Sequence, residues 1–210
     1  MPLVLATRSA GKKHELADLL RGTGLALATL DDFPEAVEPQ ETGETFEANA
    51  LLKAWAAAEA TGLWALADDS GLCVDALGGR PGVRSARYAA GSDEARWQKL
   101  LGELEGVAAD QRTARFVCVV ALAGPGGQAH SQEGVCEGRI AFAPRGAHGF
   151  GYDPVFEVAS DAAGRTMAEL SVAEKLNSLQ GLLVNYDCPR GAVLNIRFPG
   201  GGVLRGNHHL

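Results

Sequence analysis

The first twenty residues join a short apolar run to a helix through a small polar loop, and this order limits the fold of the chain. Pro2 to Thr7 is typical of a buried strand, and leucines at positions 16, 19 and 20 mark one face of a following helix. A strand that leads into such a helix is the first half of an α/β unit. We therefore expect an α/β protein.

The rest of the chain continues this alternation. Further strands are predicted over residues 25–30, 63–67, 115–123 and 128–143, the last as one or two strands that form a hairpin across the turn at 124–127. Helices are predicted over 45–61, ended by Gly62, and after Ser92, a good N-cap residue. Residues 31–44 are acidic and lack a period, which indicates a loop.

No repeat, low-complexity segment or linker divides the chain. We expect one domain of two lobes over residues 1–185, with a helix over 171–183. Residues 186–210 are rich in Gly, Pro and Arg without a period, and we expect an irregular C-terminal tail there.

Composition excludes several classes of protein. A formal net charge of −7 without a basic run argues against a nucleic-acid partner, although a few cations in a pocket can still bind a small anion. No stretch has the length and hydrophobicity of a membrane span, and no signal peptide is apparent, so we expect a cytoplasmic protein. The cysteines are far apart and form no CxxC pair, which indicates reduced thiols rather than zinc ligands: Cys73, Cys118, Cys136 and Cys188.

The first candidate site is the loop between the first strand and helix. Small side chains, a lysine and the free N–H groups of a helix N-terminus favour a phosphate group there. The spacing is not that of a Walker A loop, and a plain connection with a solvated lysine is the alternative. The candidate binding residues are Thr7, Arg8, Ser9, Ala10, Gly11 and Lys12.

Two adjacent carboxylates form the second candidate site. Asp68 and Asp69 follow the apolar run 63–67, and ligands of open α/β sheets bind beyond the carboxyl ends of strands. Consecutive residues cannot point the same way along a strand, so we expect a turn at Asp68-Asp69-Ser70-Gly71. In such a turn one aspartate can bind Mg²⁺ while the other orients or deprotonates water. An ordinary capped turn is the alternative.

Two further segments are candidates. Asn49 and Lys53 are one helical turn apart and could bring a carboxamide and a cation to a phosphate, although a solvated polar stripe is the simpler interpretation. Residues 148–154 combine glycines with Phe150 and Tyr152, either of which could stack on a purine. The alternative there is a structural turn that buries both rings.

Taken in order, these segments resemble the inosine triphosphate pyrophosphatase family, also called XTP/dITP diphosphatases. The resemblance covers residues 3 to about 178 in collinear order. The motifs that carry it are Ala6-Thr7, Gly11-Lys12, Glu41-Thr42-Gly43, Thr45-Phe46-Glu47-Ala48-Asn49-Ala50, Lys53-Ala54, Ala67-Asp68-Asp69-Ser70-Gly71-Leu72, Val74-Asp75-Ala76-Leu77-Gly78-Gly79, Pro81-Gly82, Ser85-Ala86-Arg87-Tyr88, Gly149-Phe150-Gly151-Tyr152-Asp153-Pro154, Ala168-Glu169-Leu170 and Glu174-Lys175.

The resemblance implies a central mixed β-sheet flanked by helices, in two lobes with the nucleotide cleft between them, and a homodimer. It implies Mg²⁺-dependent hydrolysis of deaminated purine nucleoside triphosphates (ITP, dITP, XTP) to the monophosphate and pyrophosphate. Asp69 would be the general base beside Asp68, and Glu41 and Asp69 would bind the metal. The first loop with Lys53, Ser70 and Lys175 would hold the triphosphate, and Phe150, Gly151, Tyr152 and Asp153 would form part of the nucleoside pocket.

Two departures from the family pattern keep alternatives open. Ser9 stands where the family usually has Asn, and no Ser-His-Arg run, which normally contacts the base, follows Lys175. The tail beyond it does not resemble the family. A broader pyrophosphatase for modified nucleotides is one alternative, and a non-catalytic nucleotide-binding protein is the other.

Overall fold

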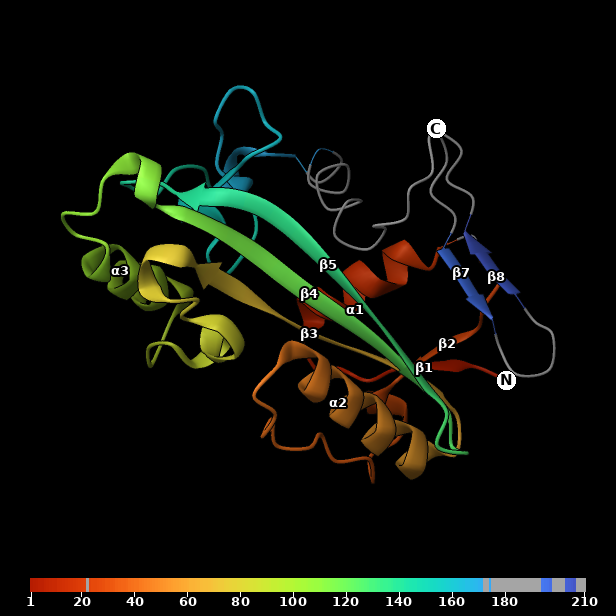
Figure 1. Cartoon of the computed structure of the whole chain (residues 1–210). Helices are drawn as coiled ribbons and strands as arrows, with labels where there is room; N and C mark the ends of the chain where they lie inside the picture. The colour runs from red at the N-terminus through yellow and green to blue at the C-terminus, as the bar shows by residue number, and fades with distance from the viewer. Residues whose placement is uncertain (22, 172–173, 175–193, 198–202, 207–210) are drawn as a thin grey trace. The chain divides into compact units, whose positions relative to one another are not determined.

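The computed structural model describes residues 1–21, 23–171, 174, 194–197 and 203–206 (Figure 1). Helices and strands occur in the order expected of an α/β protein. The helices are α1 (Ala10–Leu19), α2 (Phe46–Thr61) and α3 (Asp93–Glu103). The strands are β1 (Leu3–Leu5), β2 (Leu27–Thr29), β3 (Trp64–Val74), β4 (Thr113–Ala123), β5 (Ala129–Ile140), β6 (Phe156–Val158), β7 (Leu194–Arg197) and β8 (Val203–Gly206).

Six of these strands form one mixed sheet in the order β2-β1-β3-β4-β5-β6. β1 is parallel to both neighbours, with Leu3 opposite Leu27 on β2 and Trp64 on β3. Parallel strands need crossover connections, and α1 and α2 supply them. β5 and β6 are antiparallel. The predicted mixed α/β fold is therefore confirmed.

β4 and β5 form the predicted hairpin, and β5 is a single strand. The Gly124 N–H donates to the Gln128 carbonyl at 2.9 Å, and Gly127 has a φ of 82°. Such a left-handed conformation suits glycine at a turn. Both strands are long, and they run side by side in Figure 1.

Gly62 and Ser92 mark helix ends as predicted, and Thr45, predicted as the first helical residue, is the N-cap of α2. The Thr45 side chain accepts a hydrogen bond from the Ala48 N–H, and Gly62 ends α2 with a φ of 68°. The Ser92 side chain caps α3 by accepting from the Ala95 N–H. A capping hydroxyl contributes about 1 kcal/mol by satisfying an N–H that has no partner within the helix.

The chain divides into two compact units, in line with the two predicted lobes. The first comprises Met1–Asp68, Val120–Gln132, β7 and β8; the second contains Asp69–Val119 and the described residues from Glu133 to Glu174. The predicted domain boundary at residue 185 lies outside the described residues.

In the first unit, leucines of β1, α1 and β3 pack into one apolar cluster. Leu3, Leu5, Leu16, Leu20 and Leu66 are each at most 7% exposed. The buried apolar positions of α2 are all alanines, namely Ala50, Ala54, Ala57 and Ala58. Small side chains leave room for polar neighbours on the same helix, which matters for the site below.

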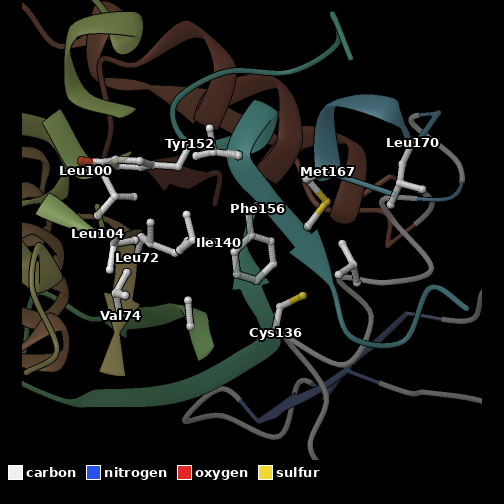
Figure 2. Packing of buried hydrophobic residues seen from close by; sticks show 13 residues of the cluster. Leu72, Val74, Leu100, Leu104, Cys136, Ile140, Tyr152, Phe156, Met167 and Leu170 are labelled. Atoms are coloured by element: carbon white, nitrogen blue, oxygen red, sulfur yellow. The ribbon is translucent and has the colours of Figure 1, made fainter. Parts of the chain in front are cut away.

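The core of the second unit gathers side chains from β3, α3, β5 and the chain after β5. Figure 2 shows Phe156 between Ile140, Cys136 and Met167. The ring of Phe156 is fully buried and its centroid is 4.6 Å from that of Phe116. Tyr152 belongs to the same cluster, so the loop before β6 is packed into this core.

Part of the C-terminal tail is regular, and the expectation of an irregular tail is wrong there. β7 and β8 form an antiparallel pair with Leu194 opposite Gly206 (Figure 1). Apolar and polar residues alternate in Leu194-Asn195-Ile196-Arg197, which is a strand signal. The Gly and Pro residues around this segment favoured the prediction of an irregular tail. The helix predicted over 171–183 lies mostly outside the described residues.

Cys73, Cys118 and Cys136 are free thiols, as expected, and Cys188 lies outside the described residues. Burial raises the pKa of the Cys136 thiol to about 11. Over the part of the chain that the structure describes, no helix has the length and hydrophobicity needed to cross a membrane.

Candidate active site

The first loop caps the helix that follows it. Thr7 is 5% exposed, and its hydroxyl accepts a hydrogen bond from the Ser9 N–H at 3.2 Å. Ser9 is the N-cap of α1, and its hydroxyl accepts from the Lys12 N–H at 3.5 Å. Ser is a good N-cap residue, so the loop sequence itself favours the start of the helix at this point. The predicted strand, loop and helix are confirmed, and phosphate binding stays a prediction.

Lys12 connects this loop to the central strand. Its Nζ donates to Asp68 Oδ2 at 2.6 Å, and the Asp68 side chain is only 8% exposed. Burying a carboxylate is costly unless a cation and hydrogen bonds accompany it. Lys12 is such a cation, and it holds the start of α1 close to β3.

The two predicted aspartates lie inside a strand, and the turn expected at Asp68-Asp69-Ser70-Gly71 is wrong. β3 continues through them from Trp64 to Val74, between β1 and β4. The extended conformation of the long strand outweighs the local turn preference of Asp, Ser and Gly. Successive side chains of a strand point to opposite faces, so the carboxylates of Asp68 and Asp69 have different surroundings. Both residues are buried, at 7% and 5% exposure.

Asn49 and Lys53 are buried on α2, and the solvated stripe considered above is wrong. Asn49 is fully buried and Lys53 is 5% exposed. Lys53 Nζ donates to Glu41 Oε1 at 3.0 Å, and Asn49 Oδ1 accepts from the Gly43 N–H at 2.8 Å. The segment from Glu41 to Gly43 therefore lies against α2, where the alanine positions leave space for it.

Gly43 is required by this contact. A Cβ atom at that position would lie 2.7 Å from Asn49 Oδ1 and 2.8 Å from the Ala48 Cβ. Both distances are shorter than van der Waals contact. The Glu41-Thr42-Gly43 motif and Asn49 thus form one unit that places the Glu41 carboxylate.

In the second unit, the aromatic loop exposes one ring and buries the other. Gly149 and Gly151 have φ values of 94° and 60°, so the backbone turns on either side of Phe150, which is 56% exposed. Tyr152 is 4% exposed and its hydroxyl donates to the Ser85 carbonyl at 2.9 Å. Burial raises the pKa of Tyr152, so the hydroxyl stays protonated. Of the two rings, Phe150 is the one exposed to solvent, whereas Tyr152 is packed in the core; stacking on a base stays a prediction.

Ser85 was not among the predicted site residues, yet it connects two of their segments. Its hydroxyl accepts from the Leu72 N–H on β3 at 2.9 Å and donates to the Gly82 carbonyl at 2.7 Å. Its carbonyl receives the Tyr152 hydroxyl. Ser85 lies in the Ser85-Ala86-Arg87-Tyr88 motif, but a motif match alone does not reveal which groups the serine contacts.

The Ala168-Glu169-Leu170 motif supports the start of the same loop. The His148 N–H donates to the Ala168 carbonyl at 3.1 Å. Gly146 has a φ of 79°, and a Cβ there would lie 2.3 Å from the Ala168 carbonyl carbon. Ser85 and Ala168 thus hold the loop through its contacts at Tyr152 and His148.

Lys175 lies outside the described residues, and the residue before it is well anchored. Ser171 donates two hydrogen bonds to Glu174, from its N–H at 2.9 Å and from its hydroxyl at 2.7 Å. Arg165 pairs with the same carboxylate at 3.0 Å. These contacts, those from Ser171 first, lower the pKa of Glu174 to about 2.

Within the described ranges, no three His, Cys, Asp or Glu side chains gather in a group that could hold a metal ion. Mg²⁺ in nucleotide sites commonly takes one or two carboxylates and completes its coordination with substrate phosphates and water. Glu41 and Asp69 each carry the hard oxygen donors that Mg²⁺ prefers, and a metal site formed by them stays a prediction.

These features define an α/β protein in which two lysines each pair with a carboxylate in the first unit, and an anchored loop of the second unit exposes an aromatic ring. The chain belongs to the Ham1 family, whose model matches residues 3–179. It is 54% identical over 173 residues to a dITP/XTP pyrophosphatase of Symbiobacterium thermophilum, covering 82% of this chain and 85% of that one. A dITP/XTP pyrophosphatase of Bacillus subtilis is 47% identical over 174 residues, covering 82% and 87%.

Solved structures agree with the family. A HAM1 protein from Coxiella burnetii matches with a TM-score of 0.77 and 44% identity, covering 84% of this chain and 90% of that one. A nucleoside-triphosphatase, dITP/XTP pyrophosphatase, from Mycobacterium abscessus gives 0.73 and 43%, covering 86% and 94%. The family match ends before β7, as expected for a tail unlike the family.

Proposed function

We propose that this protein hydrolyses deaminated purine nucleoside triphosphates, such as dITP, ITP and XTP, to the monophosphate and pyrophosphate. The observation that carries the proposal is the identity of 54% over 173 residues with a protein named dITP/XTP pyrophosphatase. The buried pairs Lys12–Asp68 and Lys53–Glu41 support it, because phosphoryl chemistry depends mainly on positioned positive charge.

The two lysines would hold the triphosphate. An ammonium group has three N–H donors, so each lysine can keep its carboxylate and still donate to a phosphate oxygen. The free N–H groups at the start of α1 would add donors from the backbone. Ser70, on β3, and Lys175 complete the proposed phosphate-binding set.

Asp69 would accept the proton of the attacking water. Its burial within β3 holds the carboxylate in one place, as a general base requires. Glu41 and Asp69 would hold Mg²⁺, which when bound would neutralise charge on the phosphates and help orient the water. Attack at the α-phosphorus releases pyrophosphate as the leaving group and leaves the nucleoside monophosphate.

Phe150 would stack on the base, next to the backbone of Gly151 and Tyr152 and the side chain of Asp153. Selectivity against ATP would come from donors that face a 6-oxo group and leave a 6-amino group unsatisfied. Buried polar groups left without partners can support large discrimination.

A substrate panel tests the proposal. Wild-type protein with Mg²⁺ is given dITP, XTP, dATP and dGTP, and the released pyrophosphate is measured. We expect kcat/KM for dITP and XTP to exceed that for dATP by at least about a hundredfold. Equal turnover of dITP and dATP would favour the broader pyrophosphatase, and binding without turnover would favour the non-catalytic protein.

A homodimer in the cytoplasm is also part of the proposal. The support is the family relationship. Trp97 on α3, an apolar residue that could have marked an interface, packs against the core of its own unit. Light scattering should give about twice the mass of one 21.9 kDa chain, and the mass of a single chain would contradict the dimer.

A further inference from the structure

The tip of the aromatic loop depends on an anchor outside the loop. Gly149 and Gly151 flank Phe150, and glycine has access to many backbone conformations. Within the loop, the Asp153 N–H donates to the Phe150 carbonyl at 3.2 Å, and the Phe150 N–H donates to Asp153 Oδ2 at 3.4 Å. These hydrogen bonds close the turn but leave its orientation to other contacts.

Asp93, on α3, makes that outside contact. The Gly151 N–H donates to Asp93 Oδ2 at 2.7 Å, across 58 residues of sequence. A hydrogen bond of this length to a carboxylate is charge-assisted and stronger than one between neutral groups. The peptide immediately after Phe150 is thereby fixed to the start of a helix.

Asp93 is not needed to cap its own helix. That role belongs to Ser92, whose hydroxyl accepts from the Ala95 N–H at 3.2 Å. The other carboxylate oxygen of Asp93, Oδ1, pairs with Arg96 on the next turn of α3. Arg96 thus holds the carboxylate in the orientation that presents Oδ2 to the loop.

Glu94 provides a natural comparison. It stands in the same first turn of α3 and has the same charge, so it contributes equally to the electrostatics of the helix start. The hydrogen bond described for its carboxylate comes from Gln98 on the same helix, at 3.0 Å. An effect specific to Asp93 must therefore come from its contacts with the loop and with Arg96, and exchange at the Gly151 amide reports on the loop contact.

We propose that Asp93 is a positioning residue for nucleoside recognition, which holds the Gly151 peptide and thereby the orientation of the Phe150 ring. This inference rests on the proposed function, in which Phe150 stacks on the base. Asp93 itself does not contact the reacting phosphates. Its loss should therefore weaken binding of the nucleoside and leave the chemical step nearly unchanged.

Hydrogen exchange in the ligand-free protein tests the anchor without any assumption about activity. In Asp93→Ala the Gly151 amide should exchange about tenfold faster, while Glu94→Ala should match the wild type. Asp93→Asn keeps an acceptor oxygen and should stay within about threefold of the wild type. Unchanged exchange at Gly151 in Asp93→Ala would overturn the anchor. If Asp93→Ala fails to fold, Asp93→Ser, which is too short to reach the loop, replaces it.

Steady-state kinetics with dITP and Mg²⁺ tests the positioning role. We expect KM for Asp93→Ala to rise about tenfold with kcat within about twofold, and both the Glu94→Ala and Asp93→Asn variants to remain close to wild type. A loss that falls on kcat with KM unchanged would overturn the inference, as would faster exchange at Gly151 with unchanged kinetics. If the wild-type protein does not turn over dITP at all, the proposed function is wrong. The exchange data would still show whether Asp93 holds the Gly151 peptide.

Discussion

Lys53 on α2 and Glu41 in the preceding loop form an ion pair of 3.0 Å in which the lysine side chain is 6% exposed. The other buried positions of α2 are Asn49 and four alanines, and the loop approaches the helix closely. The pair keeps a cation and a carboxylate together in a place where each would be costly to bury alone. This arrangement explains why a short acidic loop has a defined conformation.

Lys53→Met should lower kcat/KM for dITP by about a hundredfold, because it removes a positioned cation from the phosphates. It should also destabilise the protein by up to about 3 kcal/mol, since Glu41 loses its buried partner. Both quantities can be measured on the same preparations by steady-state kinetics and urea unfolding. Lys99→Met, which changes a lysine with a 46% exposed side chain, is the control. If Lys53→Met and Lys99→Met were equally active, Lys53 would not be part of the site.

Asn49→Ala should reduce the free energy of unfolding by about 1–3 kcal/mol, because the Gly43 N–H loses its acceptor in a buried place. Gly43→Ala should also destabilise the protein, through the close contact of the new methyl with Asn49 Oδ1. Urea unfolding checks both, with the exposed helix position Glu59→Ala as the control. Two variants with wild-type stability would show that the loop is not held by Asn49.

Asp69→Asn should reduce turnover of dITP by at least about a hundredfold and leave nucleotide affinity within a few fold, since a general base acts in the chemical step. Pyrophosphate release and equilibrium binding of dITP are the two measurements. Asp75→Asn, an exposed carboxylate just after β3 that pairs with Thr113 and Arg115, serves as the control. A variant at Asp69 that keeps full turnover would require another base.

The hydrogen bond from Tyr88 to Glu103, 2.6 Å long, should make stability depend on pH at both ends of the scale. This bond, the largest cause, lowers the pKa of Glu103, so its stabilisation is present above the ordinary carboxyl pKa of 4.5 and is lost as pH falls below it. Burial, and after it the hydrogen bond to Glu103, raises the pKa of Tyr88 from 10.0 to about 12. The protonated hydroxyl therefore stabilises the folded state below pH 10, and this stabilisation is lost as the pH rises from 10 to about 12.

Tyr88→Phe tests this dependence, since it removes the hydroxyl and keeps the ring beside Lys99. The variant should be destabilised by less than about 1 kcal/mol at neutral pH, because both groups are partly exposed. Urea midpoints should fall less steeply than those of the wild type below pH 4.5 and above pH 10. Parallel profiles for the two proteins would contradict the assignment.

Local signals in the sequence predicted much of the fold. Thr45, Gly62 and Ser92 mark helix ends through contacts with their near neighbours, and such contacts can be anticipated from spacing alone. The turn predicted at Asp68-Asp69-Ser70-Gly71 was wrong because these residues belong to a long strand of the central sheet, and the formation of a sheet depends on contacts that are not local.

The supporting contacts of the candidate site are also long-range. Asn49 and Lys53 were recognised as a pair, but their burial depends on a loop that folds back over α2. Ser85 and Asp93 act on residues 67 and 58 positions away, through hydrogen bonds that no sequence period encodes. The charged candidate residues of the site could therefore be predicted from the sequence, whereas the residues that position them were identified only in the structure.

Product analysis with dITP is the most direct test of the central claim. The wild-type protein is incubated with dITP and Mg²⁺, and the products are separated by anion-exchange chromatography. We expect dIMP and pyrophosphate in equal amounts, the products of attack at the α-phosphorus. Unchanged dITP, or dIDP with inorganic phosphate, would contradict it.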